Sequence, residues 1–197
     1  MSTPIGIDKM MPIIGILRLQ AYSKQDKLLW KTASHNLIVA SGYWAVAKAL
    51  AGVPNMNISK VAIGTNGSPA QESDTLITDA VLIDIQKIEY PKEVTVRFNF
   101  EIGYSEAVGM NIREFGLLTQ EGKLFSRKVR EVIEKTQHFR IVGMWDVNIY
   151  DGDYLYDYNE DYSDDYSSPD VDGDTEGLSN IQLTDSEIIF DAAGNLI

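Results

Sequence analysis

The charges of this 197-residue chain are divided unevenly between its two parts. Residues 1–147 hold all 17 Lys and Arg and 15 of the 29 Asp and Glu, which gives a net charge of +2. Residues 148–197 hold the other 14 acidic residues and no basic residue. A segment with so much like charge repels itself and has little aliphatic side chain to bury. We therefore divide the chain into a body, residues 1–150, and an acidic extension, residues 151–197.

The acidic extension changes character along its length. Six of the ten tyrosines follow residue 147 and are interleaved with aspartates, a composition typical of a solvated, disordered tail. Apolar residues return near the end, although a tail that served only solubility would not need them: Ile181, Leu183, Ile188, Ile189 and Phe190. We hypothesise that this end docks on a neighbouring subunit by adding a strand to its sheet edge, while the acidic linker follows a basic surface.

Alternating polar and apolar residues in the body predict strands. The clearest period of two runs through residues 93–102, where four apolar side chains alternate with polar ones. Other strands are expected at 14–23, 28–39, 58–63, 80–90, 112–119, 124–129 and 139–150. Seven or eight strands separated by turns predict a mainly β fold, an antiparallel β-sandwich or jelly-roll-like body with one short α-helix.

The one helix is expected at residues 42–51. Ser41 would cap its N-terminus and Gly52 would end it. Tyr43, Val46, Ala47 and Leu50 recur at helical spacing and predict one apolar face that packs on the sheet.

The sequence offers few groups for catalysis or for ligands. There is no Cys, and the two histidines, His35 and His138, have no metal-binding spacing, so we expect no enzyme activity, no cofactor and no imidazole metal site. His35 is expected to be a hydrogen-bonded structural residue. Apart from residues 127–130, the basic residues are scattered, which argues against nucleic-acid binding. The longest apolar runs are far below the ~20 residues of a membrane span.

One metal-like pattern lies in the extension, at residues 170–177. Its alternate acids, Asp170, Asp172, Asp174 and Glu176, resemble the first half of an EF-hand loop, which binds Ca²⁺ through oxygens. However, Thr175 stands where that loop has Gly, and Ile181 stands where it has the bidentate Glu. Calcium binding at the acidic extension is therefore an alternative and not the expectation.

The order of segments in residues 28–149 resembles a broad group of bacteriophage tail-associated structural proteins, which includes tail fibre, collar and baseplate components. The matching segments are Asn36-Leu37-Ile38 with Gly42, Gly64-Thr65, Asp74-Thr75-Leu76, Glu114-Phe115-Gly116-Leu117 and Lys135-Thr136. Two positions depart from the group's pattern, because Asn66 replaces Gly and Leu118 replaces an aromatic residue. The resemblance implies a non-enzymatic virion protein that assembles as repeated copies with other tail proteins, after residing in the host cytoplasm.

The matched residues are given architectural roles. Gly42 and Gly64 are expected to permit chain reversals, and Leu76 and Leu117 to fill the core. Glu114 stands between apolar neighbours, so a buried Glu114 would need hydrogen-bond donors. We predict that backbone amides or Asn36 supply them; the alternative is a surface carboxylate on an edge strand.

Two other functions remain open from the sequence. The first is a carbohydrate- or receptor-binding module at a tail fibre, with Trp44 and Trp145 as the residues that would stack on sugars. The second is a polyanionic DNA mimic, in which the acidic extension occupies the basic groove of another protein.

Overall fold

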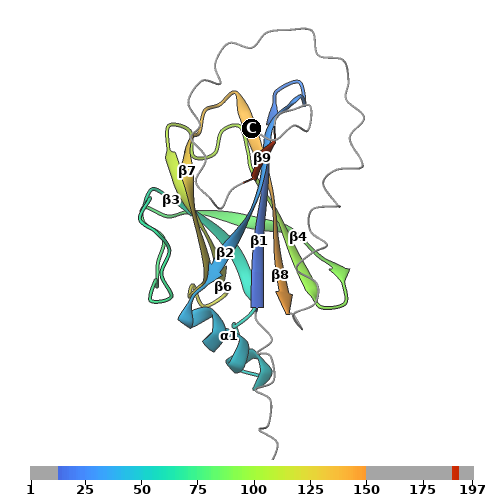
Figure 1. The fold of residues 1–197 in the computed structure, drawn as a ribbon, viewed down its shortest axis with the longest axis vertical. Helices are drawn as coiled ribbons and strands as arrows, with labels where there is room; N and C mark the ends of the chain where they lie inside the picture. Colours follow the sequence, from blue (N-terminus) through green and yellow to red (C-terminus); the bar gives the residue numbers. More distant parts are fainter. Residues whose placement is uncertain (1–12, 150–187, 191–197) are drawn as a thin grey trace, which may run out of the picture.

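The computed structural model describes residues 13–149 and 188–190 (Figure 1). Its strands are β1 (Ile13–Ser23), β2 (Leu28–Ile38), β3 (Ile58–Gly64), β4 (Val81–Lys92), β5 (Thr95–Ile102), β6 (Asn111–Thr119), β7 (Leu124–Glu134), β8 (Phe139–Ile149) and β9 (Ile188–Phe190). One helix, α1 (Ala40–Leu50), joins β2 to β3. Each strand expected in the body is present, and β1 and β2 form the expected hairpin.

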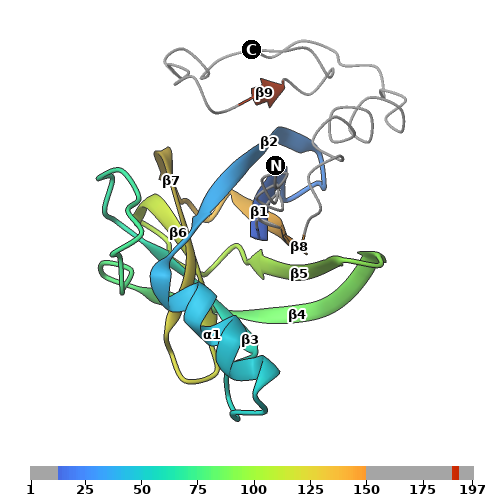
Figure 2. The same cartoon turned by 60° about the horizontal axis from the view of Figure 1, so that its bottom comes forward.

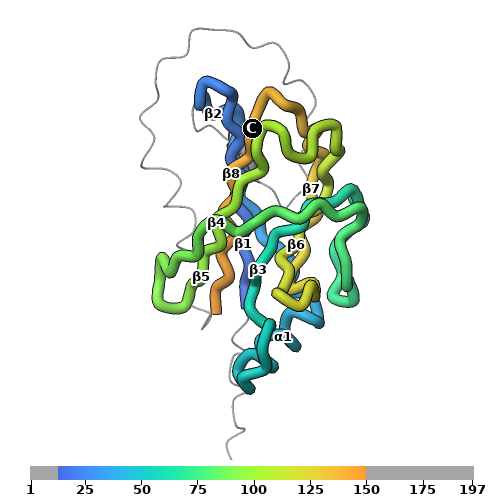
Figure 3. The backbone as a smooth tube through the Cα atoms, turned by 180° about the vertical axis from the view of Figure 1, so that it is seen from behind, coloured from blue at the N-terminus to red at the C-terminus, as the bar shows by residue number. Residues whose placement is uncertain are grey.

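The first eight strands form a closed antiparallel barrel. Their order is β1-β8-β5-β4-β3-β6-β7-β2, and β1 also pairs with β2, which closes the circle (Figure 2). Figure 3 shows the other side, where β4 runs between β3 and β5. The prediction of a β-sandwich or jelly roll is therefore wrong. Inward and outward residues alternate in the same way in a sandwich and in a barrel, so the sequence period does not separate the two. The pairing of β1 with β2 closes the barrel, and β9 is not needed for this closure.

The barrel interior is packed with large apolar side chains. Trp145, Phe100 and Phe115 are fully buried there. Phe100 pairs with Gly143 on β8, and a Cβ at Gly143 would lie 2.0 Å from Cζ of the Phe100 ring. The glycine thus leaves the space in which the ring lies across the neighbouring strand.

Helix α1 begins and packs differently from the expectation. Its N-cap is Val39, and Ser41 donates its hydroxyl to the Leu124 carbonyl at 2.5 Å instead of capping the helix. The C-terminal end agrees with the prediction, because Gly52 follows the helix with a φ of 75°. Gly42 makes no chain reversal: a Cβ there would lie 2.1 Å from the Phe125 carbonyl oxygen, so it is needed for close packing of α1 on β7.

The apolar face predicted for α1 is mostly solvent-exposed. Tyr43, Ala47 and Leu50 are exposed, and the helix instead buries Gly42 and Ala45. The surface that α1 buries is narrow, because the small residues Gly42 and Ala45 let the helix approach β7 closely. Among the described residues, no helix is both long and apolar enough to cross a lipid bilayer.

Candidate functional site

The barrel is split between β2 and β7. These strands pair only at Leu37–Arg127 and Ile38–Ser126, although each continues for several residues beyond this point. The other edge of β2 is fully used by β1. One edge of β2 is therefore available to a further strand along most of its length.

Strand β9 occupies part of this edge of β2. Ile188 pairs with Ala33, Ile189 with Thr32 and Phe190 with Lys31, in antiparallel register. The hypothesis placed this strand on the sheet edge of a neighbouring subunit, whereas here it lies on an edge of its own chain. Docking on a neighbouring subunit stays a prediction. Ile181 and Leu183 lie outside the described residues.

A groove of about 460 Å³ lies at the split, next to the residues that β9 covers. Its walls come from β2, from β7 and from the loop after β3. The charged and titratable residues that line it are His35, Arg113, Arg127, Lys128, Arg130 and Glu131. Four of these carry a positive charge and one a negative charge, and Arg127 is paired with two carboxylates beneath the groove.

A buried ion-pair network lies beneath the groove and is centred on Arg127. Its Nε donates to Glu114 Oε2 at 2.7 Å, and its Nη1 donates to Asp74 Oδ2 at 2.7 Å. Glu114 is completely buried, and its Oε1 accepts from the backbone N–H groups of Asn66 at 3.2 Å and Thr78 at 2.8 Å. The prediction that backbone amides support a buried Glu114 is confirmed. Asn36 is not one of its donors: its Oδ1 accepts from Trp145 Nε1 at 2.8 Å.

Two members of this network, Arg127 and Asp74, have shifted pKa values. Burial alone would lower the pKa of Arg127, but the hydrogen bonds and charges of Asp74 and Glu114 outweigh burial and raise it. Burial would raise the pKa of Asp74, but the Gln71 amide and Arg127 outweigh it and lower that pKa. Both residues are therefore charged at neutral pH.

The network fastens the loop after β3 to the outside of β6 and β7. Thr65 donates its hydroxyl to Asp79 at 2.8 Å, and Asp74 accepts from the Gln71 amide at 2.8 Å, so the loop is also fixed within itself. Beneath it, Ile77 is buried against Gly64 and Gly116, where an added Cβ would lie 2.4 Å and 2.7 Å from Ile77. The residues that hold this loop closed are thus Gly64, Thr65, Asp74, Glu114 and Gly116.

Two of the expected roles in this region are wrong. Leu76 is 65% exposed and does not fill the core, because Ile77 is the residue that turns inward. Gly64 allows the close approach of Ile77 and of the Thr78 carbonyl, and does not reverse the chain. Leu117 does lie in the core, as expected.

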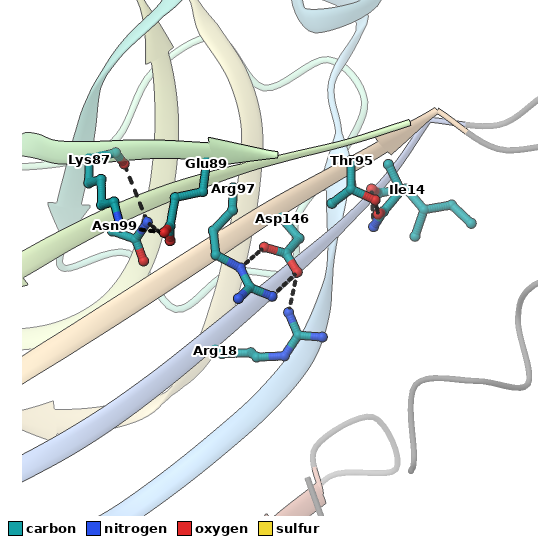
Figure 4. A network of polar contacts seen from close by, with 9 residues as sticks. Ile14, Arg18, Lys87, Glu89, Thr95, Arg97, Asn99 and Asp146 are labelled. Carbon is teal, nitrogen blue, oxygen red and sulfur yellow. Dashed lines mark hydrogen bonds and ion pairs between the residues drawn. The ribbon is translucent and has the colours of Figure 1, made fainter. Parts of the chain in front are cut away.

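A second ion-pair network is centred on Asp146 (Figure 4). Arg18 Nη1 donates to Asp146 Oδ2 at 2.6 Å, while Arg97 donates through Nε to Oδ1 at 2.7 Å and through Nη2 to Oδ2 at 2.9 Å. The three residues come from β1, β8 and β5, and the network ties these three strands together. No local pattern in the sequence indicates this network, because the partners lie up to 128 positions apart.

Lys135 is a further buried charge. Its Nζ donates to the carbonyl oxygens of Thr136 at 2.8 Å and Phe139 at 2.9 Å. Burial lowers its pKa, and the charge of Glu106 opposes this only in part. Lys135 and Thr136 therefore form the turn between β7 and β8, and not a ligand site.

The histidines and tryptophans lie as follows. His35 is exposed and lines the groove, so the expectation of a hydrogen-bonded structural histidine is wrong. Trp145 is fully buried and unavailable to a sugar, whereas Trp44 is 51% exposed.

The part of the chain that the structure describes contains no cluster of acids and histidines able to hold a metal ion. The calcium-like pattern at 170–177 lies outside it.

Comparisons with family models, with curated proteins and with solved structures give no match for this chain.

Proposed function

We propose that this protein is a non-enzymatic structural component of a bacteriophage tail that assembles through its C-terminal strand. The pairing of β9 with the edge of β2 supports this proposal most strongly. An edge that accepts a strand from its own chain accepts the same strand from a neighbouring copy through the same contacts. The assignment to a bacteriophage tail rests on the resemblance of the segments in residues 28–149 to tail-associated proteins.

The barrel is suited to such a role. It closes without β9, so a chain can give its C-terminal strand to a neighbour and keep its own fold. The closed loop after β3 and the buried networks make it a rigid unit, which repeated assembly requires.

A proline at position 189 tests this function. Proline lacks the backbone N–H and is not tolerated in a paired strand, so Ile189→Pro should remove β9 pairing. In tail particles built from the variant, we expect the protein to be absent, although the isolated barrel melts as before. Ile189→Val is the matched control and should be incorporated normally. The proposal would be contradicted if the Ile189→Pro variant were incorporated normally. It would also be contradicted if the unmodified chain never entered tail particles.

A carbohydrate- or receptor-binding module is the second candidate, because α1 presents two exposed aromatic residues. Tyr43 and Trp44 are adjacent there, and Lys48 Nζ lies 3.5 Å from the centroid of the Trp44 ring. Aromatic faces of this kind stack on sugars and cations. Binding to a glycan array that Trp44→Ala abolishes would favour this candidate.

A further inference from the structure

Strand β4 has an open edge over its second half. Residues 81–84 of this strand pair with β3, and the strand then continues to Lys92. Among the described strands, only β5 pairs with this continuation (Figure 2). The edge that faces β3 at the start of β4 is therefore left for a further strand along residues 85–90.

The open half of β4 presents apolar side chains to solvent. Ile88 is 49% exposed and Tyr90 is 74% exposed. Large apolar residues grouped on a sheet edge are typical of surfaces that bind another protein chain.

The charges on this edge complement a second copy of the same edge. Lys87 and Glu89 stand on either side of Ile88 and share one face, where Lys87 Nζ donates to Glu89 (Figure 4). In an antiparallel pair of two such edges, with Ile88 opposite Ile88, each Lys87 lies opposite the Glu89 of the other copy. Opposite charges on facing residues stabilise a strand pair, whereas like charges destabilise it.

The same pattern disfavours other strands. A lysine on an edge strand repels most partners, and here only a strand with the reverse order of charges compensates it. Strand β9 offers no charge to this edge, because its three residues are apolar. Pro91 lacks a backbone N–H and limits the pairing to residues 86–90.

We propose that the second half of β4 binds a second copy of this chain, edge to edge and antiparallel, with Ile88 at the two-fold axis. A contact of about five residues in each chain is small beside a standard interface of about 1,600 Å², so the association is weak. This contact is separate from the pairing of β9 and does not rest on the proposed function.

Sedimentation equilibrium of the full-length chain tests the proposal. Every chain in the experiment carries Ile189→Pro, so that exchange of β9 between copies makes no contribution. Lys87→Glu and Glu89→Lys each place two pairs of like charges across the edge. We expect either change to raise the dimer Kd about tenfold or more.

Two controls separate this effect from others. Glu72→Lys makes the same change of net charge as Glu89→Lys but lies in the loop after β3, and it should leave the Kd unchanged. The melting temperatures of the variants should match that of the parent chain, because the Lys87–Glu89 pair is exposed and exposed pairs contribute little to stability.

A mixture of the two single variants gives the sharpest result. The Lys87→Glu chain carries two acidic residues on the edge, and the Glu89→Lys chain carries two basic ones. Each register position then brings opposite charges together, so we expect a mixed dimer with a Kd close to that of the parent chain.

Three results would overturn the proposal. The parent chain could stay monomeric at about 1 mM, which would mean that this edge gives no useful association. Both single variants could associate as the parent does, or their mixture could stay monomeric. Association that occurs only with Ile at position 189, and that Lys87→Glu does not weaken, would show that copies meet through β9 instead.

Discussion

Glu114 and Asp146 are two buried carboxylates on the outer face of one barrel, and they are held in different ways. The Glu114 network is closed by the loop that directly follows β3, through amides of that loop and through Asp74. The Asp146 network has equally short ion pairs, and its arginines come from the neighbouring strands β1 and β5. The comparison teaches that a buried carboxylate on the outside of this barrel is held either by a loop folded onto it or by arginines of adjacent strands.

The largest effect is expected for Glu114→Ala. It leaves the Arg127 guanidinium buried beside only one carboxylate and removes the acceptor of two backbone amides. Loss of one partner of a buried pair costs about 3–5 kcal/mol. We expect the melting temperature to fall by about 10 °C or more, since about 1 kcal/mol corresponds to several degrees in a domain of this size. An unchanged melting curve would contradict a structural role for this network.

A smaller loss is expected for Gly64→Ala, which tests how tightly the loop closes over Glu114. The new Cβ would lie 2.5 Å from the Thr78 carbonyl oxygen and 2.6 Å from Glu114 Oε1. Overpacking of this kind costs about 1–3 kcal/mol. Gly67→Ala is the matched control, because its nearest neighbour is the flexible Arg113 side chain at 3.2 Å. Denaturant unfolding should show a loss for the first variant only; equal stability of both would mean that the loop has room to move.

The smallest loss is expected for Asp74→Asn, at the partly exposed end of the network. Removal of this pair should cost about 1 kcal/mol near neutral pH. The folded pKa of Asp74 lies below its ordinary value of 3.8, so its contribution is present above that pH and is lost as the pH falls through the folded pKa. Denaturation across pH should show the wild type and Asp74→Asn converging in acid. A stability difference that stays constant down to pH about 2 would contradict the assigned ion pair.

The positions of the strands could be predicted from the sequence, and the closure of the sheet could not. Alternation in residues 93–102 located β5, although the turn before it falls at Glu93-Val94 and not at Pro91-Lys92. Alternation says which residues face inward, but not that β1 pairs with β8 and β2 with β7 on their other edges. These long-range pairings close the barrel around the expected β1–β2 hairpin.

The candidate site could be predicted only in part, for similar reasons. Glu114 was recognisable because a carboxylate among apolar neighbours in a strand must find donors. The burial of Ile77 instead of Leu76 could not be predicted, because a loop has no period that fixes the direction of its side chains. The Asp146 network was not recognisable, since Arg18, Arg97 and Asp146 meet only after three strands pair.

The folding of the barrel without residues 150–197 is the most direct test of this account. Unfolding free energies would be measured for the full chain and for residues 1–149, which retain every strand needed to close the barrel. We predict cooperative unfolding of the shortened chain. Glu114→Ala should lose the same amount of unfolding free energy in both chains, because every partner in its network lies within residues 66–127. A shortened chain that does not fold would contradict the account.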